Sequence, residues 1–70
     1  MSTWRATKAR RVYAALLRLE WEFRKQVGSH RKLCRPGWPN FTFCVHDSEE
    51  VGPAALARIA KDTGLRPEDL

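Results

Sequence analysis

Near the start of the chain, apolar residues recur with the period of a helix. Five of them stand at steps of three and four residues, with alanines between them: Val12, Tyr13, Leu16, Leu17 and Leu19. This pattern predicts a helix from Thr7 to Leu19. The opposite stripe carries three cations: Lys8, Arg11 and Arg18. One side of the helix can therefore face a core, while the other faces either water or phosphate.

The middle of the chain alternates between apolar and polar residues, which is typical of half-buried strands. Its segments are, in order, a strand at 21–26, a turn at 27–29, a strand at 30–35, a loop at 36–40 and a strand at 41–46. The loop reads PGWPN and is rich in turn-forming residues. The economical interpretation is a meander of three antiparallel strands.

The last part of the chain carries the signals of a second helix. Gly52-Pro53 places proline in its first turn, AALARIAKDT supplies an apolar side, and Gly64 is a natural end. We expect Leu56, Ile59 and Ala60 to be buried, Leu65 to fold back, and RPEDL to begin one further turn. The chain, residues 1–70, is thus predicted to be one α+β domain in the order α-β-β-β-α, with a three-stranded antiparallel sheet and both helices on one face.

The period of two assigns each strand residue to one face of the sheet. We expect six apolar residues to face the helices: Trp21, Phe23, Leu33, Phe41, Phe43 and Val45. The opposite face of the sheet, which is open to solvent, would then carry Glu22, Arg24, Gln26, His30, Lys32, Cys34, Thr42, Cys44 and His46. Trp21 and Phe23 can share a face with Leu33 only across an odd turn, so we predict a three-residue turn that contains Gly28.

The second hairpin predicts a site for chemistry. If PGWPN is the whole loop, Arg35 faces Phe41, Lys32 pairs with Cys44, and His30 pairs with His46. Histidine can take a proton from a ribose 2′-hydroxyl or give one to the leaving 5′-oxygen, while nearby cations stabilise charge on the phosphate. This chemistry needs no metal. The alternative is that both histidines are ordinary exposed polar residues.

The net charge of +5 is unevenly distributed. Residues 1–35 hold ten lysines and arginines against two acids, whereas residues 36–70 hold three cations against six acids. This asymmetry favours contact between the first half of the chain and a polyanion, for which nucleic acid is the usual candidate. The alternative is a well-solvated surface.

The cysteines and the first residues bear on location and cofactors. Cys34 and Cys44 stand in a chain whose opening is neither a signal peptide nor a membrane span, so we expect a cytoplasmic protein with reduced thiols. With His30 and His46 they form a Cys2His2 set, but residues of the same type are widely separated, which disfavours zinc. We expect no metal and no other cofactor.

Three features together resemble a known family. The run WEFRKQVGSHRKL, a later strand that ends at His46, and the ending IAKDTGLRPEDL are similar to the HicA (YcfA-like) toxins of HicAB toxin–antitoxin systems, from about Val12 to Leu70. The resemblance implies a fold similar to the double-stranded-RNA-binding domain and a cytoplasmic mRNA endoribonuclease that inhibits translation and growth. It also implies a HicB-like antitoxin that covers the active face. The histidine of the family's GSH motif is catalytic, and here it is His30.

Other residues are assigned around His30. Lys32, His46 and Ser29 are candidates for supporting the chemistry, and Gly28 is expected to be a turn residue with positive φ. The predicted RNA contacts are Lys8, Arg11, Arg24, Lys25 and Arg31. Trp38 can either stack on a base or cover the edge of the core, and the pattern does not place Trp4.

The chain departs from the family pattern at several places. Glu20 replaces a usual glycine, Cys44 replaces a frequent proline, and the loop before Phe41 is longer than in compact members. These departures leave the transfer of a role to His46 open. Two other functions remain: a non-catalytic RNA-binding module of the same fold, and, less favoured, a DNA-binding accessory, for which a base-reading recognition helix is lacking.

Overall fold

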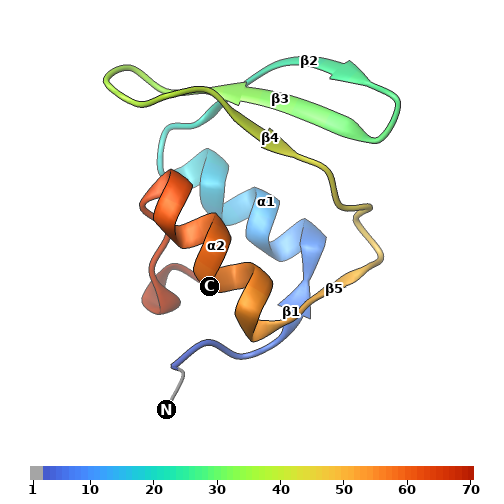
Figure 1. Ribbon diagram of the computed structural model, residues 1–70, viewed down its shortest axis with the longest axis vertical. Coiled ribbons are helices and arrows are strands. Elements are labelled where there is room, and N and C mark those ends of the chain that lie inside the picture. The colour runs from blue at the N-terminus through green and yellow to red at the C-terminus, as the bar shows by residue number, and fades with distance from the viewer. Residues whose placement is uncertain (1–2) are drawn as a thin grey trace.

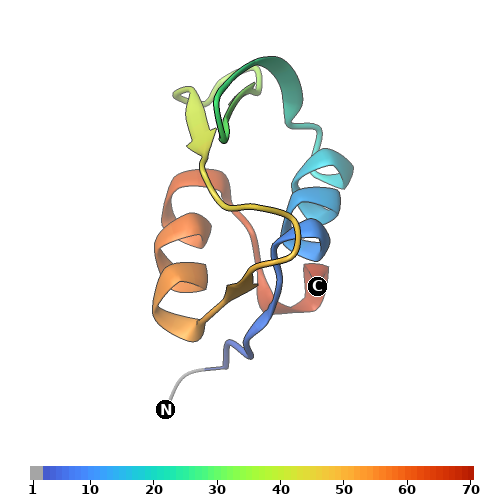
Figure 2. The same ribbon diagram turned by 90° about the vertical axis from the view of Figure 1, so that its right-hand side faces the viewer.

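The computed structural model describes residues 3–70 and confirms the predicted α+β architecture (Figure 1). In chain order the elements are β1 (Thr7–Lys8), α1 (Ala9–Arg18), β2 (Glu22–Val27), β3 (His30–Cys34), β4 (Phe41–Phe43), β5 (Glu50–Val51), α2 (Pro53–Thr63) and the 3-10 turn η1 (Pro67–Asp69). Strands β2, β3 and β4 form an antiparallel sheet in that order. Both helices lie on one side of this sheet (Figures 1 and 2).

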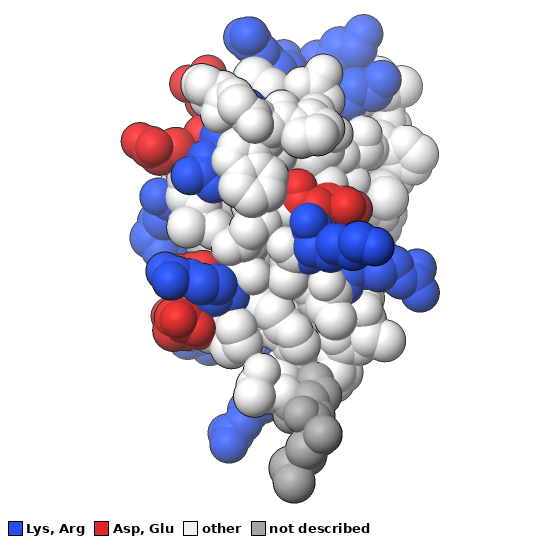
Figure 3. All heavy atoms as spheres, turned by 60° about the vertical axis from the view of Figure 1, so that its left-hand side comes forward, with Lys and Arg blue, Asp and Glu red and all other residues white. Residues whose placement is uncertain are grey.

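Cationic side chains gather at the end of the molecule that the sheet forms. The neighbouring strands β2 and β3 carry Arg24, Lys25, Arg31 and Lys32, and cationic side chains gather at the sheet end, at the top of Figure 3. Lower on the same view, acidic and basic side chains lie beside one another. Of the ten cations in residues 1–35, four therefore lie on β2 and β3 and three on α1.

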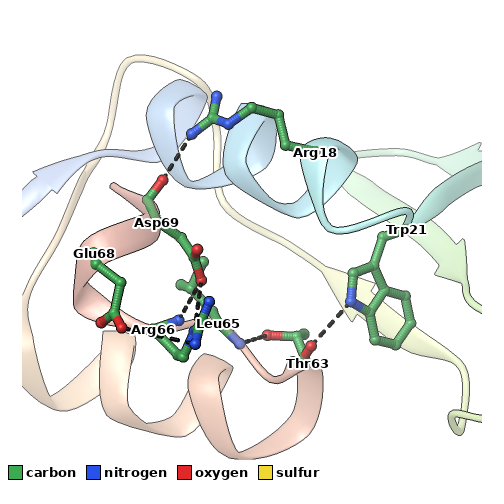
Figure 4. A network of polar contacts seen from close by, with 7 residues as sticks. All are labelled: Arg18, Trp21, Thr63, Leu65, Arg66, Glu68 and Asp69. Atoms are coloured by element: carbon green, nitrogen blue, oxygen red, sulfur yellow. Dashed lines mark hydrogen bonds and ion pairs between the residues drawn. The ribbon is translucent and has the colours of Figure 1, made fainter.

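The core lies between the two helices and the sheet. Its largest fully buried apolar side chains come from α1, the residue before β2, the sheet and α2: Val12, Leu16, Trp21, Leu33, Phe43 and Leu56. The indole Nε1–H of Trp21 donates a hydrogen bond to the backbone carbonyl of Thr63 at 3.1 Å (Figure 4). The Thr63 hydroxyl in turn donates to the Ile59 carbonyl at 2.7 Å. The start of β2 is thereby fixed to the last turn of α2 without an unsatisfied polar group.

The end of α2 follows the prediction. Gly64 adopts the left-handed conformation with φ of 79°, and Leu65 is buried beneath it. Pro67–Asp69 add the expected further turn, and the Asp69 carbonyl accepts a hydrogen bond from the Arg18 guanidinium at 2.7 Å (Figure 4). The C-terminal turn is thus attached to α1.

A small second sheet was not predicted. Thr7 pairs with Val51 and Lys8 with Glu50, so that the first helix begins at Ala9 rather than at Thr7. The N–H groups of Ala9 and Arg10 donate to backbone carbonyls of the acidic segment, at residues 49 and 47. Backbone carbonyls therefore satisfy the start of α1 in place of a capping side chain.

The first hairpin corrects the predicted turn. Val27 pairs with His30, so the turn contains two residues, Gly28 and Ser29, and the three-residue prediction was wrong. The extra residue stands instead in a bulge between Phe23 and Lys25. The bulge restores the alternation, because Phe23 still lies opposite Leu33.

The bulge changes which residues occupy each face. Lys25 now pairs with Lys32, and Gln26 pairs with Arg31 rather than lying on the open face. Phe23 was expected in the core but is 48% exposed, because β2 is the outer strand and burial ends at Leu33 of β3. On α1, Leu17 of the predicted apolar stripe is likewise exposed.

The second hairpin corrects the predicted register. Leu33 pairs with Phe41 and Lys32 with Thr42, two positions away from the expected pairing. Strand β4 ends at Phe43, so the predicted pairs of Lys32 with Cys44 and of His30 with His46 do not form. Because the shift is even, each residue keeps its face. Arg35 belongs to the loop, since its carbonyl accepts the Trp38 N–H at 3.0 Å in a turn.

Candidate functional site

His30 is the first residue of β3 and is exposed to solvent. The turn before it is fixed in two ways. Gly28 adopts a positive φ of 61°, as expected of a glycine turn, and the Gln26 side-chain amide donates to the Gly28 carbonyl at 2.9 Å. Ser29 completes the turn beside His30. The local sequence therefore holds the backbone of His30 at the hairpin end.

The face of the sheet turned away from the helices is called the open face. Its residues lie in three rows across the strands: Val27 and His30; Lys25, Lys32 and Thr42; Glu22 and Cys34. The row with both lysines is next to His30, at a distance along β3 of about 7 Å for two residues. One imidazole and two ammonium groups thus share a solvent-exposed surface. Arg24 stands in the bulge beside them.

Arg31 lies on the helix-facing side and is engaged there. Its guanidinium forms an ion pair with the Asp47 carboxylate at 2.7 Å and lies 4.6 Å from the centre of the Tyr13 ring. Only 18% of its side chain is exposed. These contacts hold β3 to the segment after β4. The contact of Arg31 with RNA stays a prediction.

His46 stands in a turn rather than on a strand. Its carbonyl accepts the Glu49 N–H at 2.9 Å, and its own N–H donates to the Glu49 carboxylate at 3.3 Å. The structure therefore gives His46 no cross-strand partner, although its side chain is exposed.

The remaining predicted cations lie away from the open face. Lys8 belongs to β1, at the opposite end of the molecule from the sheet in Figure 1, and its ammonium group donates to the Ser48 carbonyl at 3.2 Å. Arg11 lines a hollow between the N-terminal segment and the C-terminal turn, together with Trp4, Arg5 and Leu70. The structure thus brings His30 together with Lys25 and Lys32 but not with Lys8 or Arg11.

The sequence that forms this site matches a protein family. A family model described as the HicA toxin of bacterial toxin–antitoxin systems matches residues 9–65. The chain belongs to the HicA toxin family. Membership gives the chain a toxin role within a toxin–antitoxin pair. No curated protein and no solved structure matches the chain.

Trp38 of this HicA-family toxin covers the edge of the core. Its ring centre lies 6.0 Å from that of Trp21, in an edge-to-face arrangement, and the Arg35 guanidinium lies 5.2 Å from it. A side chain at Gly64 would place its Cβ 2.8 Å from the indole, so glycine is required there for a second reason besides its positive φ. The indole is nevertheless 37% exposed. Trp4, which the sequence did not place, packs partly buried against the core.

The two cysteines form no disulfide with one another. Cys34 is half-buried and Cys44 exposed, and both are reduced. Within residues 3–70, no three His, Cys, Asp or Glu side chains gather as metal ligands, and no helix has the length and apolar character to cross a membrane.

Sequence reasoning missed two residues of the open face: Lys25, and Val27, which was assigned to the turn. Lys25 was assigned as an RNA contact but not to this face, because the bulge that moves it there leaves no mark in the apolar pattern. Arg24-Lys25 within an edge strand is the signal that could have suggested an irregularity, since edge strands often carry charged residues and bulges.

Proposed function

We propose that this HicA-family toxin is an endoribonuclease that cleaves mRNA without a metal ion and so inhibits translation and growth in the cytoplasm. The observation that carries the proposal is the row of Lys25 and Lys32 beside His30 on the open face. RNA backbone can lie across a flat cationic surface of this kind, and the two ammonium groups would attract its phosphates.

His30 would act on the ribose next to the scissile phosphate. Its neutral imidazole takes the proton of the 2′-hydroxyl, and the 2′-oxygen attacks phosphorus as the bond to the 5′-oxygen breaks. The products are a 2′,3′-cyclic phosphate and a 5′-hydroxyl, whose proton comes from the imidazolium or from water. Lys32, with Lys25 beside it, would stabilise the negative charge on the non-bridging oxygens. Ser29 stands next to His30 in the turn as a further donor to phosphate.

His46 is not needed for this mechanism. It lies in the turn after β4 with no strand partner, so a second histidine beside His30 is not part of the paired sheet. A single imidazole can act first as base, by taking the proton of the 2′-hydroxyl, and then as acid, by giving a proton to the leaving 5′-oxygen.

A second candidate function is RNA binding without catalysis. It is favoured by the His30 imidazole itself, which makes no hydrogen bond or ion pair with any other group in residues 3–70. Catalytic histidines are usually oriented by such a partner, although apo geometry often lacks it. In this case the toxin would act by occupying RNA rather than by cutting it.

The partner of this toxin is proposed to be a HicB-like antitoxin that covers the open face. Because the open face carries Lys25 and Lys32 beside His30, an antitoxin would inhibit the toxin by placing acidic side chains over the two lysines and by excluding RNA from His30.

The deciding experiment uses the purified toxin and a labelled RNA in EDTA. We expect cleavage with cyclic or 3′-phosphate ends, and no cleavage at a position where the ribose is replaced by 2′-deoxyribose. His30→Ala should be inactive while still binding RNA. Cleavage that stops in EDTA and returns with Mg²⁺ would overturn the metal-free mechanism. A folded wild-type toxin that binds RNA without cutting it would establish the second candidate.

A further inference from the structure

A hollow of about 480 Å³ lies beside β4, the outer strand of the sheet on the side away from β2. It is formed between the segment that leads into β4 and the last turn of α2. Its walls include Trp38, Asn40, Phe41, Thr42, Lys61 and Asp62. Figure 3 shows the side of the molecule on which the loop before β4 lies, where uncharged atoms are next to the cationic sheet end. Its size falls in the usual range for small-ligand sites, about 300–1,000 Å³.

One wall of the hollow is aromatic and rigid. Trp38 contacts the Trp21 ring and the Arg35 guanidinium. Its indole also packs against Gly64, where a Cβ would leave no room for it. Phe41 is also held, with its ring centre 6.1 Å from that of Trp21. An aromatic side chain already fixed in place loses little conformational entropy when a planar ligand stacks on it. The wall is therefore suited to a planar ring.

The remaining walls carry polar side chains. The side chains of Asn40, Lys61 and Asp62 are exposed, and none of them makes a hydrogen bond or ion pair within residues 3–70. Together they offer an amide that donates and accepts, a carboxylate that accepts, and a cation. A planar ligand with hydrogen-bond donors and an attached anion matches this set.

The hollow is continuous with the open face. Thr42 contributes to both, because it lines the hollow and pairs with Lys32. On the open face, Thr42 lies opposite Lys32, so it is about 7 Å along the strand and one strand spacing of about 5 Å across from His30. A single strand of RNA crosses this distance within a few nucleotides. A strand cleaved at His30 can thus reach the hollow.

We propose that the hollow binds one unpaired base of the RNA, a few nucleotides from the cleavage point, and so sets a base preference at that position. The base stacks on Trp38, Asn40 and Asp62 contact its edge, and Lys61 binds the adjoining phosphate. A carboxylate only accepts hydrogen bonds, and the single donor of uracil, its N3–H, lies between two carbonyl oxygens that repel a carboxylate. The site therefore favours bases with an exocyclic amino group (adenine, cytosine or guanine) over uracil. This inference rests on the proposed action on RNA.

The test measures binding by the His30→Ala protein, which does not cut its ligand. The probes are a uridine tetranucleotide and its variants with a single adenosine, cytidine or guanosine. We expect an amino-bearing variant to bind about five- to a hundredfold more tightly, as for other base-edge contacts. The Nε1–H NMR signal of Trp38, identified by its loss in Trp38→Phe, should shift on binding.

Exposed substitutions separate recognition from folding. Asp62→Asn should remove the preference for an amino group, measured as the ratio of the affinities for the amino-bearing and uridine tetranucleotides. The loss of the negative charge should strengthen the binding of every tetranucleotide, so this ratio is the quantity compared. Arg58→Ala is the matched control, because Arg58 is exposed on the same helix but does not line the hollow. It should keep the preference of the parent protein.

Two outcomes would overturn the inference: an unshifted Trp38 signal with saturating RNA, or an amino-group preference that Asp62→Asn leaves intact. Either would mean that the hollow is only the edge of the core. Failure of the proposed function is distinct, because it appears as wild-type toxin that does not cleave RNA, whatever the Asp62 variant binds.

Discussion

The two faces of β3 differ in the exposure of their side chains. Leu33 points toward the helices and is only 1% exposed, whereas His30 and Lys32 lie on the open face. The helix-facing side joins the core through Leu33, whereas within residues 3–70 the side chains of His30 and Lys32 make no hydrogen bond or ion pair. Substitutions on the open face can therefore change function without stability, and substitutions at Leu33 should do the reverse.

The largest effect expected from the open face is on catalysis. His30→Ala should lower the cleavage rate by about 10²–10⁴, the usual contribution of a general acid–base residue. Its stability should change by no more than about 0.5 kcal/mol, because the side chain is exposed and without partners. Single-turnover cleavage and urea unfolding of the same preparation measure the two quantities. A His30→Ala protein that unfolds at much lower urea would show that the faces are coupled.

The helix-facing side should give the opposite result. Leu33→Ala should lower the free energy of unfolding by about 2–5 kcal/mol, because it leaves a cavity among tightly packed residues. Lys32→Ala, one position away on the open face, is the matched control and should change that free energy by no more than about 0.5 kcal/mol. Equal losses in the two variants would contradict the assignment of faces.

The division between the faces could be predicted because it depends on parity, which is local. Each strand residue alternates with its neighbour, so Leu33 and Phe43 were assigned to the core and His30 and Lys32 to the open face without knowledge of any partner strand. The helix ends at Gly52-Pro53 and Gly64 are equally local, since they depend on backbone preferences of single residues.

Register is not local, and it was predicted incorrectly. Parity required one extra residue in the first hairpin, but the pattern could not distinguish a longer turn from the bulge at Arg24. In the second hairpin, the loop is long because Trp38 packs against Trp21 and Gly64, which are distant in sequence. The pairing of His30 with His46 failed for this reason. The two-residue strands β1 and β5 are too short to show any period.

The open face can also be compared with the distant end of the molecule. Lys25→Ala and Lys32→Ala should each lower the slope of log affinity against log salt for single-stranded RNA by about 0.7, the value for one phosphate contact. Lys8→Ala should leave this slope unchanged, because Lys8 lies in β1 and donates to the Ser48 carbonyl. The measurement is a salt titration of RNA binding in the His30→Ala background. An equal effect of Lys8→Ala would extend the RNA contact along α1.

The smallest effect is expected at the connection between α1 and β2. Glu20 has a φ of 74°, and in residues 3–70 it is the one residue other than glycine with a positive φ. Its N–H donates to the Leu17 carbonyl, and the next N–H, of Trp21, donates to the Leu16 carbonyl. This pattern ends a helix with a left-handed residue, a position that glycine occupies without strain.

Glu20→Gly should therefore raise the free energy of unfolding by about 0.5–1 kcal/mol, because relief of the left-handed strain exceeds the extra entropy of the unfolded chain. Glu22→Gly is the matched control, since Glu22 lies in β2 without a positive φ, and it should lower stability by about 0.5–1 kcal/mol. Urea unfolding of both variants tests the sign. Cleavage by the Glu20→Gly protein should equal that of the wild type, because the connection lies before the start of β2 and His30 pairs with the other end of that strand. A loss of stability in both variants would show that the Glu20 side chain contributes more than its backbone conformation costs.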